Sequence, residues 1–190
     1  MKKFNNRENK AHKLTDGKIL WESRSVAIVA TIIVKLDEQY FVLVSKRGRE
    51  SLDEKGKWNL TCGYLDWDET LNQAVERELW EETGLDLDIL KPNLIIDELS
   101  SPWRVHSDPI ANRQNVSCHF GCVAEVDRLP ELSLDNNEVE GEVESVIWLP
   151  LDDIDKINKE WAFNHDKIIK MFIERFIYKK KREKAMYCNE

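Results

Sequence analysis

A nine-residue run rich in valine and isoleucine, Val26–Val34 (VAIVATIIV), constrains the fold of this chain most strongly. A strand with apolar side chains on both faces must be buried on both faces, so its sheet needs covering layers on each side. A short turn and a second apolar run, Tyr40–Ser45, follow and predict an antiparallel partner. Because strand and helix patterns then alternate along the chain, the sequence predicts a sheet covered by helices.

A helix is predicted over residues 67–83. Asp66 is the expected N-cap, with Glu69 three residues later completing a capping box. Gly84 stands where a glycine commonly ends a helix.

Further strands are predicted near residues 85–99 and at Val116–Val126, where apolar residues alternate. The stretch between them, residues 101–115, contains two prolines and is predicted to be a long functional loop. A last strand, Val143–Leu149, precedes a final amphipathic helix over residues 162–183.

Length and charge narrow the class of protein. The 190 residues suit one domain, which we expect at 23–178, after a loose extension over 1–22 and before a basic tail over 179–190. The net charge of −8 disfavours binding of long nucleic acid through its phosphates. We find neither a membrane-length apolar run nor a secretory signal, and four cysteines are too few for a disulfide scaffold. A soluble, cytoplasmic protein is therefore expected.

Cys118, His119 and Cys122 are close enough in sequence to suggest a zinc site. On an alternating strand, however, the two cysteines share one face and His119 lies on the other. We therefore expect core packing at these positions.

The predicted helix over 67–83 carries an electrostatic conflict. At 100° per residue, its apolar residues share a face with Glu78, Glu81 and Glu82. Like charges at this spacing repel one another, and acids at a helix C-terminus oppose the helix dipole. A divalent cation would resolve the conflict, because carboxylate oxygens suit Mg²⁺ or Mn²⁺, and a carbonyl from the preceding turn at Gly63 could add a ligand. A solvated acidic helix end is the alternative.

The same residues resemble the signature of the Nudix hydrolase family, G-x5-E-x7-R-E-U-x-E-E-x-G-U, in which U is aliphatic. Every spacing is intact. The positions are filled by Gly63, Glu69, Arg77, Glu78, Leu79, Glu81, Glu82, Gly84 and Leu85. The start of the last predicted helix, Ala162–His165, is similar to a segment of the ADP-ribose-pyrophosphatase-like branch, and the likeness covers residues 24 to about 175.

This resemblance implies an α/β/α sandwich with a mixed β-sheet, in the α+β class. It also implies metal-dependent hydrolysis of a nucleoside diphosphate linked to another moiety. Glu78 and Glu82 are the first expected metal ligands, Glu81 is a third ligand or the group that takes the proton from water, and the Gly63 carbonyl could coordinate as well. Since family members are often homodimers, a homodimer is also expected.

Three further acidic or basic residues are assigned at the catalytic centre. Arg77 points about 100° away from Glu78, so it is better placed to pair with Glu69 or another acid and orient the helix. In several family members the general base lies outside the signature. Glu142 and Glu144, in an acidic stretch before and within the last strand, are the candidates here, with a solvated loop as the alternative.

Four residues outside the signature are predicted to bind the substrate. Arg47, Arg104 and Arg113 are candidates for phosphate contacts, although exposure is the ordinary fate of an arginine. Trp58 lies before the signature and could stack on a base, or serve in packing like other tryptophans of the chain.

The leading function is therefore hydrolysis of a small nucleotide, with ADP-ribose or a nucleotide sugar as the first substrate expected. Removal of noncanonical nucleoside triphosphates is the second enzymatic reading, and action on RNA 5′ ends is the third. A non-catalytic nucleotide-sensing module is the alternative from another class.

Overall fold

A computed structural model describes residues 10–22, 26–110, 113–157 and 160–179 of the chain. Its main sheet has eight strands in the order β10-β4-β3-β9-β7, with β5 beside β4, β6 beside β3 and β8 beside β9. The β3–β9 pair is parallel and the other pairs are antiparallel, so the sheet is mixed. The strands are β3 (Val26–Leu36), β4 (Gln39–Arg47), β5 (Trp58–Asn59), β6 (Thr61–Tyr64), β7 (Leu94–Glu98), β8 (Arg104–Ile110), β9 (Arg113–Val126) and β10 (Val143–Pro150).

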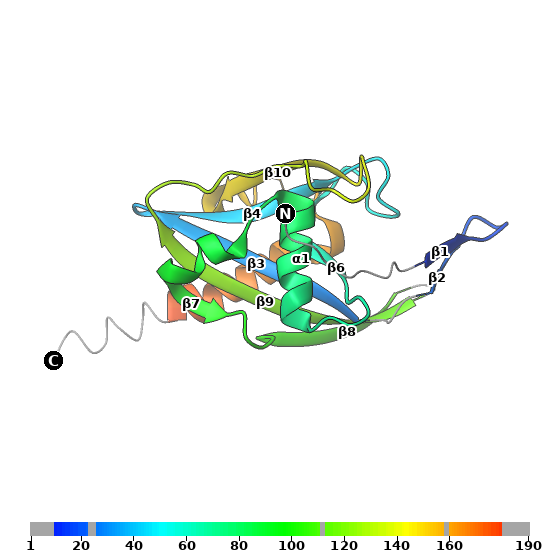
Figure 1. The fold of residues 1–190 in the computed structure, drawn as a ribbon, viewed down its shortest axis with the longest axis horizontal. Helices are drawn as coiled ribbons and strands as arrows, with labels where there is room; N and C mark the ends of the chain where they lie inside the picture. Colours follow the sequence, from blue (N-terminus) through cyan, green and yellow to red (C-terminus); the bar gives the residue numbers. More distant parts are fainter. Residues whose placement is uncertain (1–9, 23–25, 111–112, 158–159, 180–190) are drawn as a thin grey trace.

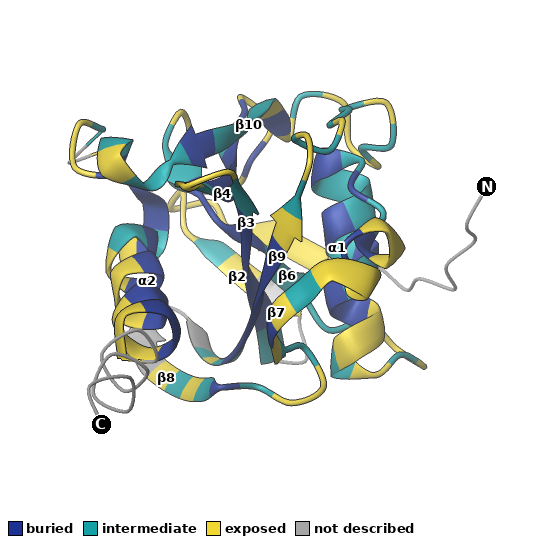
Figure 2. Cartoon of the chain, turned by 90° about the vertical axis from the view of Figure 1, so that its left-hand side faces the viewer, coloured by how far each residue is buried: buried dark blue, intermediate teal, exposed yellow. Residues whose placement is uncertain are grey.

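The central strand β3 is buried on both faces, as its sequence predicts. Alternate residues from Ile28 to Val34 pack on the side of helix α1 (Leu71–Thr83), and Val29 and Ile33 pack on the side of α2 (His165–Phe172). Figure 2 shows the sheet between these two helices. The α/β/α sandwich is therefore confirmed.

Helix α1 starts later than predicted. Its N-cap is Thr70 and its capping box pairs Thr70 with Gln73, whereas Asp66 and Glu69 lie before the helix. Asp68 adopts a positive φ of 63°, which interrupts the helical backbone at this point. Glu69 accepts a hydrogen bond from the Asp66 N–H at 2.7 Å, so half of the predicted box forms in the turn that precedes the helix. The end is as predicted, with Gly84 in the left-handed region.

Two predictions beyond α1 need correction. Residues 104–110 of the predicted loop form strand β8, which pairs antiparallel with β9. Among the described strands β8 pairs with β9 alone, so it is an edge strand, and such a strand tolerates Pro109. Residues 85–99 contain two short 3₁₀ helices, Leu87–Ile89 and Lys91–Asn93, before β7 begins.

The last helical region lies at the chain end as predicted, with α2 continuing as a π-helical stretch, Ile173–Tyr178. Its apolar side chains are buried against the sheet, as their spacing predicts. Residues 180–190, most of the predicted basic tail, lie outside the described residues. A third short 3₁₀ helix spans Leu151–Asp153, and a fourth, Ala162–Asn164, leads into α2.

The N-terminal extension differs from the loose segment that we expected. Strands β1 (Lys10–Lys13) and β2 (Ile19–Glu22) pair as a hairpin that stands away from the main sheet in Figure 1. Gly17, with φ at 82°, supplies the left-handed residue of the turn. Residues 1–9 lie outside the described part. No helix among the described residues is long and apolar enough to cross a membrane.

Candidate active site

A cleft of about 950 Å³ lies where the C-terminal half of α1 faces β6, the end of β4 and the loop before β10. Eight of the eleven site residues predicted from the sequence line it: Arg47, Gly63, Arg77, Glu78, Glu81, Glu82, Arg104 and Glu142. The fold therefore brings the acidic end of α1 together with basic residues from two separate strands.

Arg77 is buried at the centre of a carboxylate cluster. Its guanidinium donates to Glu69 at 2.9 and 3.0 Å, to Glu78 at 2.7 Å, to Glu81 at 2.9 Å and to the Tyr64 carbonyl at 3.0 Å. Burial alone would lower the pKa of Arg77, but the hydrogen bond and charge of Glu69 and the charge of Glu78 raise it. This arrangement agrees with the predicted pairing to Glu69 and fixes α1 against β6.

Glu78 is pressed against the backbone of Gly63. A Cβ placed on Gly63 would lie 1.8 Å from Glu78 Oε1, so no larger residue fits without moving the carboxylate. Burial raises the pKa of Glu78 to about 7, against the lowering effect of Arg77. The predicted pair of a glycine backbone and a carboxylate is thus in close contact.

Glu82 is the least satisfied member of the cluster. Its Oε2 is buried and has no hydrogen-bond partner among the described residues. Burial, followed by the charges of Glu78 and Glu142, raises the pKa of Glu82 well above its ordinary value. Arg77 therefore offsets part of the charge of Glu78 and Glu81 through direct hydrogen bonds, while Glu82 has no such bond to it.

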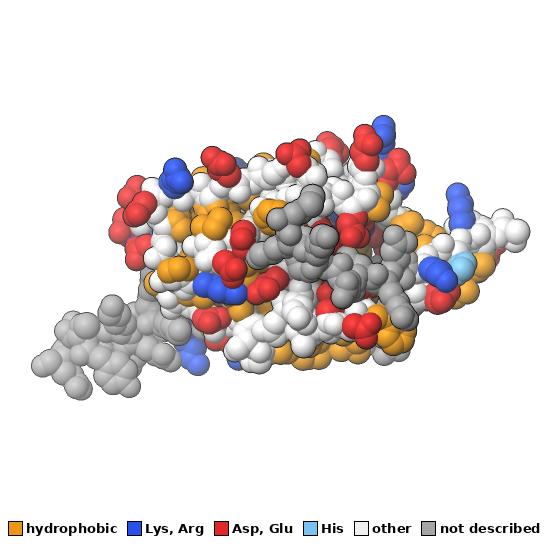
Figure 3. All heavy atoms as spheres, in the orientation of Figure 1, with side chains coloured by type: hydrophobic (Ala, Val, Ile, Leu, Met, Phe, Trp, Pro, Cys, Tyr) orange, Lys and Arg blue, Asp and Glu red, His pale blue; other side chains and the backbone are white. Residues whose placement is uncertain are grey.

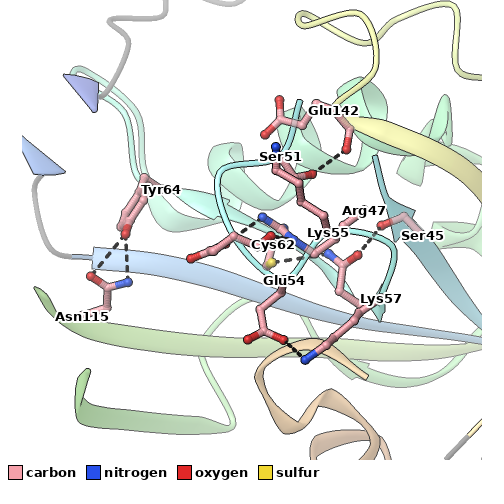
Figure 4. A network of polar contacts seen from close by, with 12 residues as sticks. Ser45, Arg47, Ser51, Glu54, Lys55, Lys57, Cys62, Tyr64, Asn115 and Glu142 are labelled. Carbon is pink, nitrogen blue, oxygen red and sulfur yellow. Dashed lines mark hydrogen bonds and ion pairs between the residues drawn. The ribbon is translucent and has the colours of Figure 1, made fainter. Parts of the chain in front are cut away.

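Arg47 lies across the cleft at the end of β4. Its Nε and Nη2 donate to the carbonyl and the carboxylate of Asp53, each at 3.0 Å. Its guanidinium carbon lies 5.1 Å from the centre of the Phe163 ring. Figure 4 shows Arg47 beside Cys62, with Glu142 on a neighbouring element.

The two candidate bases occupy different surroundings. Glu142 lies at the rim of the cleft, where burial raises the pKa of its carboxyl although the residue remains open to solvent. Its backbone carbonyl accepts hydrogen bonds from the Gly48 N–H at 2.6 Å and from the Ser51 hydroxyl at 2.8 Å, which anchors it to the β4–β5 loop. Glu144 instead pairs with Lys46 at 2.8 Å with half of its side chain exposed, and it is not among the cleft residues.

The opposite end of the cleft is polar and includes Arg104, whose Nη1 donates to His119 Nε2 at 3.0 Å. Burial lowers the pKa of His119 to about 4, so its ring is neutral. Tyr64 and Asn115 hydrogen-bond each other nearby. Arg113 belongs to β9, but its side chain lies outside the described part of the structure.

Trp58 is not among the residues of the cleft. It packs against the core on the α2 side, and its backbone bridges to Trp161. The zinc alternative also fails, since Cys118 and Cys122 are buried free cysteines in the core on the α1 side.

Sequence analysis missed Phe163 and His165 as cleft residues. His165 accepts the Leu60 N–H at its Nδ1 over 2.9 Å, and burial lowers its pKa to about 3. The apolar spacing of the last helix marks His165 only as a core position. Nothing in that spacing shows that the first turn of the helix reaches the cleft.

The donor set suits a hard divalent cation. As the side chains stand, no group of three or more His, Cys, Asp or Glu within the described ranges forms a metal-binding cluster, and Arg77 takes an oxygen of both Glu78 and Glu81. Two observations nevertheless fit a cation: the buried, unpartnered Oε2 of Glu82 and the raised pKa values of Glu78 and Glu82. Both indicate negative charge that the protein alone does not compensate.

Fold and site together define a domain in which a helix presents carboxylates to a cleft of about 950 Å³. The family model described as the NUDIX domain matches residues 26–172, more than three quarters of the chain. The chain therefore belongs to the Nudix family.

Similarity to individual proteins is more local. Phosphatase NudJ of Escherichia coli K12 is 53% identical over 36 residues, which span 19% of this chain and 24% of that protein. A bifunctional NMN adenylyltransferase/ADP ribose pyrophosphatase from Francisella tularensis, solved with AMP and a Mn ion, superposes with a TM-score of 0.63 at 26% identity. The match covers 79% of this chain and 41% of that one.

The Nudix domain of Shewanella oneidensis NrtR, solved with ADP ribose, has the same fold. Its TM-score is 0.57 at 22% identity, over 79% of this chain and 86% of that one.

Proposed function

We propose that this protein hydrolyses the diphosphate bond of a nucleoside diphosphate linked to another moiety, in a reaction that requires a divalent metal. The observation that carries the proposal is the buried, unpartnered Oε2 of Glu82 beside Glu78 in the cleft. Natural proteins tolerate such a local conflict mainly at functional sites. Membership of the Nudix family supports the same chemistry.

Glu78 and Glu82 are the residues that we propose hold the cation, with Glu81 and the Gly63 carbonyl as further ligands. Mg²⁺ or Mn²⁺ matches an all-oxygen donor set. When bound, such an ion neutralises phosphate charge and lowers the pKa of water.

The other cleft residues have separate roles in the proposal. Arg77 holds Glu78 and Glu81 in register through its charge-assisted hydrogen bonds and does not meet the substrate. Glu142 takes the proton from the attacking water, since its carboxyl stands at the rim with a raised pKa that favours accepting one. Arg47 and Arg104 bind phosphate oxygens from the other walls.

ADP-ribose is the first substrate that we propose, with nucleotide sugars next. The cleft of about 950 Å³ is large enough for a dinucleotide-sized ligand. The Francisella tularensis relative supports this choice, because it is described as an ADP ribose pyrophosphatase. A nucleotide sensor without turnover is the competing function, and the experiment below separates the two.

The test is hydrolysis of a panel with Mg²⁺ at mildly alkaline pH, with products resolved by chromatography. The panel holds ADP-ribose, UDP-glucose, NADH, diadenosine polyphosphates and oxidised dGTP. We expect AMP from ADP-ribose, abolished in Glu82→Gln and retained in Glu144→Gln, a matched change at an exposed carboxylate outside the cleft. Cleavage of another member would replace the substrate and keep the reaction. Tight binding without turnover of any member would refute the reaction and favour a sensor.

A further inference from the structure

The turn that precedes α2 holds an unusual backbone. Phe163 and Asn164 are consecutive non-glycine residues with positive φ, at 54° and 57°. Asparagine adopts this left-handed region fairly readily, but a bulky aromatic residue rarely does. Such conformations persist only where surrounding structure imposes them, and they concentrate at functional sites.

Contacts on both sides hold this turn in place. Before it, Trp161 bridges to Trp58, whose N–H donates to the Glu160 carbonyl at 2.7 Å. After it, His165 accepts the Leu60 N–H at 2.9 Å. The left-handed backbone of Phe163 is thus fixed from both ends by the β5 segment.

The ring of Phe163 lies between two neighbours, with the His165 ring at 5.5 Å between centroids on one side and Arg47 in the cleft. Phe163 lines the cleft, and its ring lies 5.1 Å from the guanidinium carbon of Arg47, within the range of a cation–π contact. Arg47 already uses Nε and Nη2 on Asp53. The ring therefore restrains the guanidinium plane, while Nη1 has no hydrogen-bond partner among the described residues.

Arg47 lies in the same cleft as the proposed catalytic carboxylates. Its side chain, Glu82 and Glu142 all line that cleft. A phosphate held near these carboxylates would meet the Nη1 edge of Arg47.

We propose that Phe163 is a positioning residue, whose strained turn fixes the Arg47 guanidinium so that its Nη1 edge binds a phosphate oxygen of the ligand. The inference rests on the proposed function and deepens it by assigning a task to a residue outside the family signature. Asp53 alone would orient two nitrogens of Arg47, and the Phe163 ring adds a restraint on the plane.

The test compares Phe163→Leu, which removes the π face, with Phe163→Tyr, which keeps it. Phe41→Leu is the matched control, because Phe41 is a partly buried phenylalanine of the α1-side core outside the cleft. Calorimetric titration with ADP-ribose and Mg²⁺ is made in a Glu142→Gln background, which removes the proposed base to suppress turnover and keeps the proposed metal ligands. We expect Phe163→Leu to weaken binding by roughly 3- to 30-fold, the range of a partly desolvated cation–π contact. Phe163→Tyr and Phe41→Leu are expected to stay within about twofold.

A double variant separates positioning from direct contact or packing. In an Arg47→Ala background, Phe163→Leu is expected to cause no further loss of affinity, because the ring then has no guanidinium to restrain. In the turnover-competent protein, Phe163→Leu is expected to raise KM by a similar factor with a smaller change in kcat. Should Phe163→Leu prove unstable, Phe163→Gly replaces it, since glycine removes the ring and adopts the left-handed backbone without strain.

Three results would overturn the inference. The first is unchanged affinity in Phe163→Leu, and the second is an equal loss with and without Arg47. The third is a wild-type protein that binds neither ADP-ribose nor inorganic pyrophosphate. If the protein binds a panel member but hydrolyses none, the proposed function is refuted and the role of Phe163 is not. The Phe163 variants are compared by their affinity for the ligand, which does not require turnover.

Discussion

Replacing Glu82 by glutamine is predicted to stabilise the metal-free protein while removing its activity. The native protein holds a proton on Glu82 more tightly than the unfolded chain does, because burial and neighbouring carboxylates raise the native pKa above the ordinary 4.5. The native state therefore binds more protons than the unfolded state above pH 4.5, so the free energy of unfolding falls as the pH rises through this window.

The structure bounds the size of this effect. The Oε2 of Glu82 is buried without a hydrogen-bond partner, and a buried polar atom left unpartnered costs about 1–3 kcal/mol. Glutamine keeps the shape and removes the charge, but leaves a buried amide that needs partners. We therefore expect a gain of about 1–3 kcal/mol, or roughly 3–10 °C in melting temperature for a chain of this size.

The assay is thermal unfolding with a chelator present, at pH 5.5 and at pH 8. The advantage of Glu82→Gln over the wild type is expected to grow with pH, because only the wild type carries the titrating carboxyl. Glu144→Gln is the control and is expected to change stability by less than about 1 kcal/mol, since its ion pair with Lys46 is solvent-exposed. Two results would refute the reasoning. In the first, Glu82→Gln melts no higher than the wild type at pH 8. In the second, its melting temperature exceeds that of the wild type by the same amount at both pH values.

Three further predictions concern neighbouring residues. Glu142→Gln is expected to lower kcat at saturating substrate by roughly 10²- to 10⁴-fold, and Glu144→Gln by less than about twofold. Equal losses in the two variants would show that Glu142 is not the base. Gly63→Ala is expected to weaken Mn²⁺ binding at least about tenfold by calorimetry, because the added Cβ would meet Glu78 Oε1 at 1.8 Å, and unchanged affinity would contradict that clash. Arg77→Lys is expected to lower the free energy of unfolding in urea titration by about 3–5 kcal/mol, because an ammonium cannot make the several directed hydrogen bonds of a guanidinium. A loss below about 1 kcal/mol would show that the buried carboxylates are stable without those hydrogen bonds.

The features predictable from the sequence are those set by periodicity and by glycine chemistry. The double-sided burial of β3 follows from its run of valine and isoleucine, and the end of α1 follows from Gly84. The predicted start of α1 is wrong, because Asp66 and Glu69 have the residue types and the spacing of a capping box although the helix begins after Thr70. In the structure Arg77 binds the Glu69 side chain, a pairing that the sequence also predicts, and Thr70 caps the helix instead.

The composition of the cleft was predictable only in part, for a similar reason. The carboxylates of α1 share a helix face, and their meeting follows from a 3.6-residue period. Phe163 and His165 reach the same cleft through a left-handed turn, which no local pattern in that segment announces. Trp58 lies outside the cleft residues, and its place beside Trp161 depends on pairing between distant segments that the local sequence does not show.

Arg77 and Glu82 together explain how an acidic helix end can be stable enough to fold and still available for a cation. Arg77 pairs with Glu69, Glu78 and Glu81 in a buried network, and its single positive charge offsets part of their charge without any metal. Glu82 lies outside that network, so its carboxylate carries most of the remaining conflict. A cation bound there would relieve a cost that the apo protein bears, and metal affinity and apo instability would then share one residue as their source. Glu82→Gln should therefore melt at a higher temperature in chelator and also lose Mn²⁺ binding. If only one of these changes occurred, metal affinity and instability of the metal-free protein would not have Glu82 as their common source.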